Sequence, residues 1–162
     1  MWDEILELAA ELGQQMQSNK LSLAVAESCT GGLLASAITA VPGSSAFFYG
    51  GIVAYSNEAK LEYLAVSRSN LENWGAVSYS TVLDMARGLR MRTKVDLALS
   101  ISGVAGPAGS EKKPVGLVYI GLVGKRRELV SVNYFSGGRE QVRLSAVLRA
   151  LVLLRSQAGF AI

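Results

Sequence analysis

The chain has 162 residues, half of them hydrophobic, which is enough for one domain with a single core. A single cysteine excludes an internal disulfide, and the absence of histidine excludes imidazole-ligated metal sites and a Ser-His-Asp triad. The net charge of +3 is mildly basic, which suits an anionic small molecule as well as nucleic acid. We expect neither a metal nor an organic cofactor.

Helices and strands alternate in the first half of the chain. In 3–17, acidic residues are concentrated in the first turn and apolar residues recur at helical spacing. Strands are indicated where apolar residues alternate with small ones, as in 21–26, or where aromatic and β-branched residues are frequent, as in 47–55. The expected elements are a helix over 3–17, a strand over 21–26, a helix that begins at Thr30-Gly31-Gly32 and stops at Pro42-Gly43, a strand over 47–55 and a helix over 56–64.

The second half adds a hairpin and a closing helix. Ser69 with Glu72 forms a possible capping box before a short segment. The further expected elements are a helix over 78–91, a strand over 95–102, an antiparallel hairpin of 115–123 with 128–135, and a helix from Gly138 onward. The order predicts one α/β domain over residues 1–162, with a mixed sheet between two helical layers, a three-layer α/β/α fold.

The sequence gives no sign of a membrane segment or a secretory signal. The longest apolar stretches, such as 115–123, are too short to span a bilayer. The chain opens with Asp3, Glu4 and Glu7 where a signal peptide would carry a basic region. We therefore expect a cytoplasmic protein that does not associate with a membrane.

The first candidate site is the strand-to-helix junction at 26–32, which carries hydroxyl groups and two glycines. Ligands of α/β sheets bind beyond the carboxyl ends of strands, and free N–H groups at a helix start can hold a phosphate or an oxyanion. The structural alternative is that Ser28 or Thr30 only caps the helix. Cys29 is either an activated thiolate or a small buried residue beside the serine.

The second candidate site is the helix start at 55–60. A cap at Ser56 or Asn57 places Lys60 in the first turn, where the helix dipole disfavours a cation and lowers a lysine pKa. Such a lysine can deprotonate a serine, and Tyr55 can relay or orient the proton. A solvated surface lysine is the alternative.

Three weaker signals complete the candidates. The glycine-rich segment 100–109 allows a ligand to approach the backbone but also suits ordinary turns. Arg139 and Arg143 open the last helix and can bind phosphate, although arginines on helices are commonly solvated. Ser45, in a turn, is a further possible nucleophile or substrate contact.

Seven short segments, in order along the chain, are more specific together than any one of them is alone. They are AESCTGG at 26–32, VPGSSAFF at 41–48, GGIVAYSNEAK at 50–60, WGAVS at 74–78, ISGVAGP at 101–107, KPVG at 113–116 and GGREQVR at 137–143. With them the chain resembles the C-terminal domain of the CinA (competence/damage-inducible) family. The resemblance implies a metal-free homo-oligomer that hydrolyses the carboxamide of nicotinamide mononucleotide to nicotinate mononucleotide and ammonia.

The resemblance also implies which residues carry the reaction. Its catalytic residues map to Ser28, Ser45, Tyr55 and Lys60, and either serine can be the nucleophile, with Ser28 and Lys60 ranked first. The candidate substrate-binding residues are Glu27, Thr30, Gly31, Gly32, Ser102, Gly103, Gly106, Arg139 and Arg143. Ser102 departs from the threonine that family members usually carry. N–H groups of Thr30 to Gly32 would stabilise the oxyanion.

The competing hypothesis is a non-catalytic nucleotide-binding or interaction module of the competence/damage-inducible type. The basic segments 87–94 and 125–127 favour it. No interleaved aromatic residues accompany these segments to stack on bases, so we expect a small nucleotide as the ligand and no nucleic acid.

Overall fold

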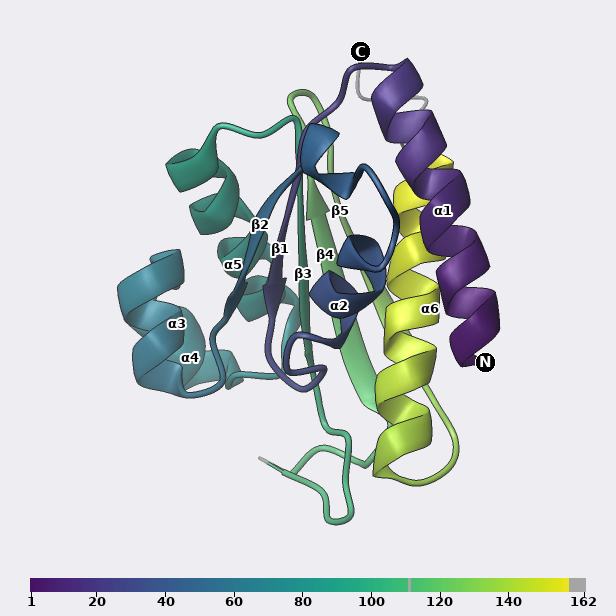
Figure 1. Ribbon diagram of the computed structural model, residues 1–162. Helices are drawn as coiled ribbons and strands as arrows, with labels where there is room; N and C mark the ends of the chain where they lie inside the picture. The colour runs from purple at the N-terminus through teal and green to yellow at the C-terminus, as the bar shows by residue number, and fades with distance from the viewer. Residues whose placement is uncertain (111, 158–162) are drawn as a thin grey trace.

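The core of the fold is a five-stranded mixed sheet in a computed structural model that describes residues 1–110 and 112–157 (Figure 1). The strands, in spatial order, are β2 (Phe48–Val53), β1 (Leu23–Glu27), β3 (Leu97–Gly103), β4 (Leu117–Val123) and β5 (Glu128–Tyr134). β2, β1 and β3 run parallel, whereas β4 and β5 form the predicted antiparallel hairpin. The predicted mixed sheet is confirmed.

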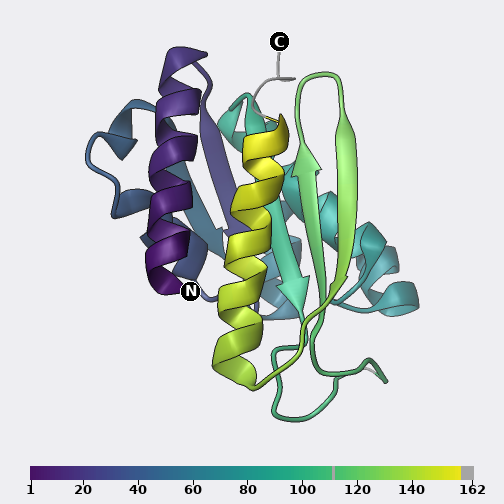
Figure 2. The same ribbon diagram turned by 90° about the vertical axis from the view of Figure 1, so that its right-hand side faces the viewer.

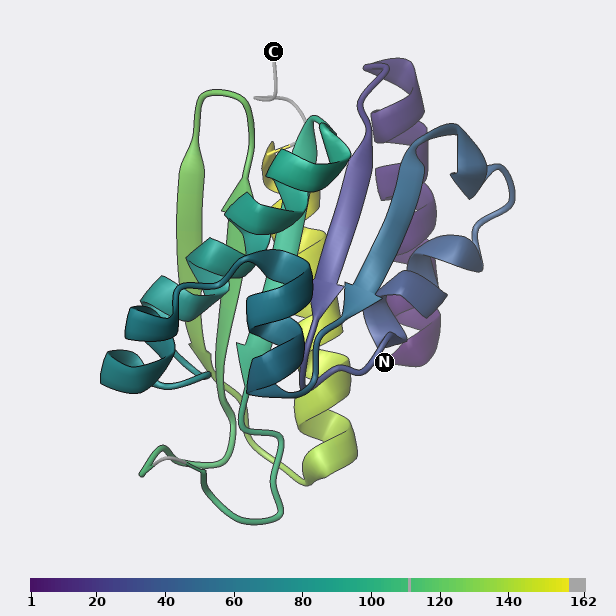
Figure 3. The same cartoon turned by 90° about the vertical axis from the view of Figure 1, so that its left-hand side faces the viewer.

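Helices cover both faces of the sheet, which confirms the predicted three layers. On one face lie α1 (Trp2–Ser18), α2 (Leu33–Thr39) and α6 (Arg139–Gln157) (Figure 2). On the other lie α3 (Asn57–Leu64), α4 (Arg68–Trp74) and α5 (Tyr79–Thr93) (Figure 3). Because β1 and the first six residues of β3 are buried, both strands are almost wholly apolar or small. No described helix is long and apolar enough to cross a membrane.

Two local predictions need correction. α2 begins at Leu33, because Thr30–Gly32 form a turn in which Gly31 and Gly32 have left-handed backbones, with φ of 61° and 94°. The capping box at Ser69 and Glu72 is wrong, since the N-cap of α4 is Ser67, whose side chain accepts from the N–H of Asn70. The predicted strands and longer helices lie within a few residues of the observed ones.

Gly88 of α5 lies directly against the end of α3, the helix that carries Lys60. A Cβ on Gly88 would lie 1.6 Å from the carbonyl oxygen of Leu64, which is backbone and cannot rotate away. We therefore expect Gly88→Ala to lower the free energy of unfolding by about 3 kcal/mol, measured by urea denaturation. Gly138→Ala, whose Cβ would meet nothing within 4 Å, is the control. Equal stability of the two variants would contradict this packing.

Candidate active site

A pocket of about 260 Å³ lies beyond the carboxyl ends of β1 and β3, at the lower end of the sheet in Figure 1. It is lined by Ser28, Cys29, Tyr55, Lys60, Ala76, Val77, the segment 102–106, Ala108, Ser110 and Arg139. These residues come from the ends of two central strands, the start of α3, the connection before α5, the loop after β3 and the start of α6. The pocket thus joins the separate segments that the sequence singled out.

Lys60 and Ser28 form the centre of the pocket. The Nζ atom of Lys60 lies 3.1 Å from the Oγ atom of Ser28, and the lysine side chain is only 1% exposed. Nζ also donates to the carbonyl oxygens of Ala54 at 2.9 Å and Tyr55 at 3.1 Å. The alternative prediction of a solvated lysine is therefore wrong, because the amine is buried and held by the site.

The first turn of α3 sets the direction of this lysine. The side chain of Ser56 accepts from the N–H of Ala59 at 3.1 Å, so Ser56 is the N-cap, as expected. Lys60 follows in the helix and turns inward, toward the end of β1. In its neutral form, an amine at this distance can accept the proton of a serine hydroxyl, so the pair can act as base and nucleophile.

Tyr55 contacts Lys60 through its backbone and not, as predicted, through its phenol hydroxyl. Its side chain is 59% exposed, and its hydroxyl oxygen accepts from Arg139 at 2.9 Å instead of contacting Lys60. The predicted proton relay through the phenol is therefore not what the structure shows. The backbone carbonyl of Tyr55 holds the amine instead. Arg139 also donates to the carbonyl of Gly106 at 2.6 Å, so it bridges two rims of the pocket.

Two N–H groups of the turn after Ser28, those of Gly31 and Gly32, are already used. The N–H of Gly31 donates to the carbonyl of Ser28 at 3.0 Å, and that of Gly32 donates to the carboxylate of Glu27 at 3.0 Å. The expectation that Gly31 and Gly32 supply oxyanion donors is therefore wrong. Glu27 is only 1% exposed and does not line the pocket, so the structure does not support its predicted role as a substrate contact.

Arg143 and Thr30 lie beside the pocket but do not line it. Arg143 donates from Nη2 to the carbonyl of Thr30 at 2.9 Å, so its guanidinium supports the turn from behind. Thr30 is fully buried, and its Oγ1 atom has no hydrogen-bond partner in the described chain. The prediction that these two side chains contact substrate directly is not met by this arrangement.

The glycine-rich segment after β3 forms one wall of the pocket, as predicted. Ser102 is buried, and its hydroxyl donates to the carbonyl of Ala76 at 2.7 Å. A Cβ on Gly103 would lie 2.6 Å from a methyl carbon of Val118, and one on Gly106, at φ 94°, would lie 2.9 Å from a methyl carbon of Val115. Both glycines are therefore required for the close packing of this wall.

Sequence reasoning missed the opposing wall, which consists of Ala76 and Val77. The Nζ atom of Lys113 donates to the carbonyls of Trp74 and Val77 and ties this wall to the loop after β3. Small apolar residues that act through their backbone carry no chemical signal of their own. Only the resemblance, through the segments WGAVS and KPVG, marked this region.

Ser45 lies far from the pair of Ser28 and Lys60. It is exposed in the short helix Ser44–Ala46, which precedes β2, whereas Ser28 follows the end of the parallel strand β1. Ser45 and the pocket are therefore at opposite ends of the sheet. Within this chain Ser45 cannot share Lys60 as its base, and the structure corrects its placement among the catalytic residues.

Cys29 is buried beside Ser28, which confirms the prediction of a small buried residue. Burial is the main cause that raises the pKa of the thiol to about 11, and the nearby Glu27 carboxylate contributes to the same shift. The ordinary value is 9.0, so near pH 8 the folded protein should hold about 100-fold less thiolate than the unfolded chain. We expect iodoacetamide to alkylate Cys29 at least about 100-fold more slowly without urea than with it, followed by mass spectrometry. Equal rates would contradict this burial.

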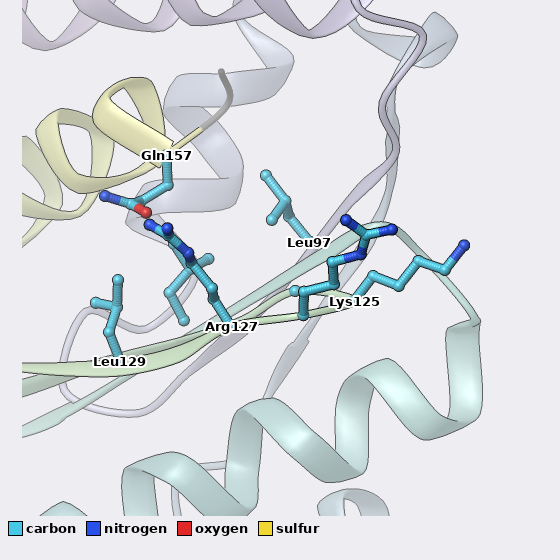
Figure 4. Close-up of a pocket in the computed structure, with 8 residues that line it drawn as sticks. Leu97, Lys125, Arg127, Leu129 and Gln157 are labelled. Carbon is cyan, nitrogen blue, oxygen red and sulfur yellow. The ribbon is translucent and has the colours of Figure 1, made fainter. Parts of the chain in front are cut away.

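A second hollow lies at the other end of the sheet, between the hairpin turn and the end of α6 (Figure 4). Lys125 and Arg127 border it, together with Leu97 and Gln157. Its volume is about 20 Å³, close to what one water molecule requires. Since no aromatic side chain belongs to the described lining, this basic end gives no support to stacking of nucleic-acid bases.

Comparisons with known proteins agree with the fold. A family model described as the CinA C-terminal domain matches residues 5–158. Nicotinamide-nucleotide amidohydrolase PncC of Enterobacter agglomerans is 50% identical over 147 residues, which are 90% of this chain and 90% of that protein. A putative competence-damage inducible protein of Thermoanaerobacter sp. (strain X514) is 47% identical over 94% of this chain.

The match to the Thermoanaerobacter protein spans only 37% of its length, and similar shares hold for other curated relatives. Solved structures are similar over nearly the whole chain. The competence/damage inducible protein CihA from Agrobacterium tumefaciens has a TM-score of 0.91 at 40% identity, over 94% of each chain. A CinA superfamily protein from Klebsiella pneumoniae has a TM-score of 0.94 at 33% identity, over 96% of this chain and 98% of that one.

Proposed function

Since this chain belongs to the CinA C-terminal domain family, we propose that it hydrolyses the carboxamide of nicotinamide mononucleotide to nicotinate mononucleotide and ammonia. The observation that carries the proposal is the buried hydrogen bond of 3.1 Å between Lys60 Nζ and Ser28 Oγ at the pocket. The relative from Enterobacter agglomerans, whose name states a nicotinamide-nucleotide amidohydrolase, supports this substrate class.

The reaction begins with attack by Ser28. The neutral amine of Lys60 takes the hydroxyl proton while Oγ forms a bond to the carboxamide carbon, and the carbonyl oxygen of the substrate becomes an oxyanion. The carbonyls of Ala54 and Tyr55 orient the amine throughout. The C–N bond then breaks, Lys60 returns the proton to the departing nitrogen, and ammonia leaves an ester on Ser28. Water, deprotonated by Lys60, hydrolyses this ester to the free acid and restores the serine hydroxyl.

Arg139 is suited to the phosphate of the substrate. Its guanidinium stands at the rim of the pocket, and within the described chain its partners are two neutral oxygens, those of Tyr55 and Gly106. A positive charge that no carboxylate balances is a ready site for a phosphate group. The position of Arg139 thus supports a nucleotide, and not the nucleoside, as the substrate.

We expect Arg139→Gln to raise KM for nicotinamide mononucleotide by about 30-fold, with kcat changed by less than about threefold, because the phosphate is remote from the reacting carbon. Steady-state kinetics with the nucleotide and with nicotinamide riboside measure this, and the riboside, lacking phosphate, should show no such loss. Arg149→Gln, an exposed arginine on the same helix, is the matched control. A KM that Arg139→Gln leaves unchanged would contradict phosphate binding here.

The proposed function is tested by incubating the purified protein with nicotinamide mononucleotide. Ammonia is measured by coupled glutamate dehydrogenase, and the nucleotide product by chromatography. Equimolar release of ammonia and nicotinate mononucleotide is expected. Binding of the nucleotide without turnover would refute the amidase and support the non-catalytic module. The homo-oligomer stays a prediction of the family resemblance, and the cytoplasmic location stays a prediction from the sequence.

A further inference from the structure

Glu27 is a buried acidic side chain that the reaction described above does not use. It is the last residue of β1 and directly precedes Ser28. Its carboxylate accepts three backbone hydrogen bonds from the start of α2. Oε2 accepts from the N–H groups of Gly32 at 3.0 Å and Leu34 at 3.1 Å, and Oε1 accepts from that of Ala35 at 2.8 Å. Both oxygens of this carboxylate therefore accept from backbone donors.

These bonds replace the cap that α2 lacks. The first N–H groups of a helix have no acceptor within the helix, and Gly32, the N-cap of α2, has no side chain to provide one. Glu27 provides it from the neighbouring strand. A carboxylate is also the group that the positive end of a helix dipole favours. A substrate phosphate is therefore not expected at this helix start, since a protein carboxylate already fills it.

The same bonds fix the turn that carries the nucleophile. The N–H of Ser28 donates to the carbonyl of Ile101 at 3.0 Å, which anchors the turn at its start on β3. Glu27 anchors it at its end through Gly32. Between these anchors, the N–H groups of Cys29 and Thr30 donate to no other residue of the described chain. Cys29 lines the pocket, and its N–H group directly follows the serine, where an oxyanion donor is expected. Thr30 is fully buried and does not line the pocket.

We propose that Glu27 is a positioning residue of the amidase, whose carboxylate holds this turn so that the N–H group of Cys29 receives the oxyanion. The inference rests on the proposed function and extends it to a residue that does not touch substrate. It predicts that substrate affinity and transition-state stabilisation depend on different parts of the site. Affinity depends on the rims of the pocket, whereas stabilisation of the transition state depends on the turn that Glu27 holds.

Glu27→Gln tests the inference, because the amide is similar in shape but would direct an NH₂ group toward N–H donors. We expect kcat to fall by about 100-fold, as for loss of an oxyanion donor, with KM within about threefold of wild type. Asp96→Asn is the matched control. Asp96 accepts from the backbone N–H and the hydroxyl of Ser22 at 2.8 Å each, at the start of β3, the end of that strand opposite the pocket. Its kcat should equal that of wild type.

A general loss of structure would not produce this split between kcat and KM. Glu27→Asp, which keeps the charge but is one methylene shorter, serves if Glu27→Gln does not fold, and it should also lower kcat, by about tenfold, with KM unchanged. Wild-type kcat in the folded Glu27 variants, or a loss confined to KM, would overturn the inference. Inactive wild-type protein would instead refute the proposed amidase, so the two failures are distinguishable.

Discussion

Ser28→Ala is expected to lower kcat for ammonia release from nicotinamide mononucleotide by at least about 10⁴-fold, because removal of the nucleophile leaves only binding and oxyanion stabilisation. The serine is nearly buried and loses one hydroxyl, so the variant should fold and still bind the nucleotide. Steady-state ammonia assays give kcat, and isothermal titration calorimetry shows whether the nucleotide binds.

Ser45→Ala is the matched control for this variant. It removes the same hydroxyl from a serine that is exposed in the short helix before β2, at the other end of the sheet. Its kcat should stay within about twofold of wild type, as for an ordinary surface substitution. Activity retained in Ser28→Ala and lost in Ser45→Ala would contradict the placement of the nucleophile at the end of β1.

Lys60→Met is expected to lower kcat by about 10³-fold, since general bases typically contribute between 10² and 10⁴. Methionine fills part of the volume but cannot accept a proton, and the carbonyls of Ala54 and Tyr55 lose their shared donor. Thermal denaturation should therefore accompany the kinetics, with rates measured well below the melting temperature. Lys125→Met, an exposed lysine in the hairpin turn, is the control and should retain wild-type kcat.

Lys60→Arg tests whether Lys60 acts as a base or only as a fixed positive charge. An arginine keeps the charge but does not deprotonate in proteins, so the variant should be as inactive as Lys60→Met. In the wild type, kcat should fall as pH is lowered, because the protonated amine cannot take the serine proton. Substantial activity of Lys60→Arg, or a kcat that rises toward acid pH, would show that Lys60 acts by charge alone.

The fold could be predicted because its patterns are local. α1 is amphipathic, and the expected range 3–17 lies within the observed Trp2–Ser18. The hairpin of β4 and β5 followed from two apolar segments around Gly124–Arg127. The start of α2 was misplaced, because propensity cannot show that two left-handed glycines extend the preceding turn. These errors concern boundaries, and the order of the elements was confirmed.

The site was predicted less completely, because side-chain direction depends on distant contacts. Lys60 was recognised from its position in a capped first turn, and that position is what directs it to Ser28. Tyr55 was assigned to the same amine by proximity in sequence, but its phenol meets Arg139, 84 residues away along the chain. Glu27 was assigned to substrate for the same reason, and only the fold reveals that its carboxylate faces α2.

The most direct test of the Ser28–Lys60 mechanism is to locate the covalent intermediate. Wild-type protein is mixed with nicotinamide mononucleotide, quenched in acid during turnover and digested with trypsin. The tryptic peptide 21–60 contains Ser28, Cys29 and Ser45, so fragment spectra must place the added mass. We predict a nicotinate mononucleotide ester on Ser28, absent from Lys60→Met. An adduct on Ser45 or Cys29, under conditions of active turnover, would contradict the mechanism.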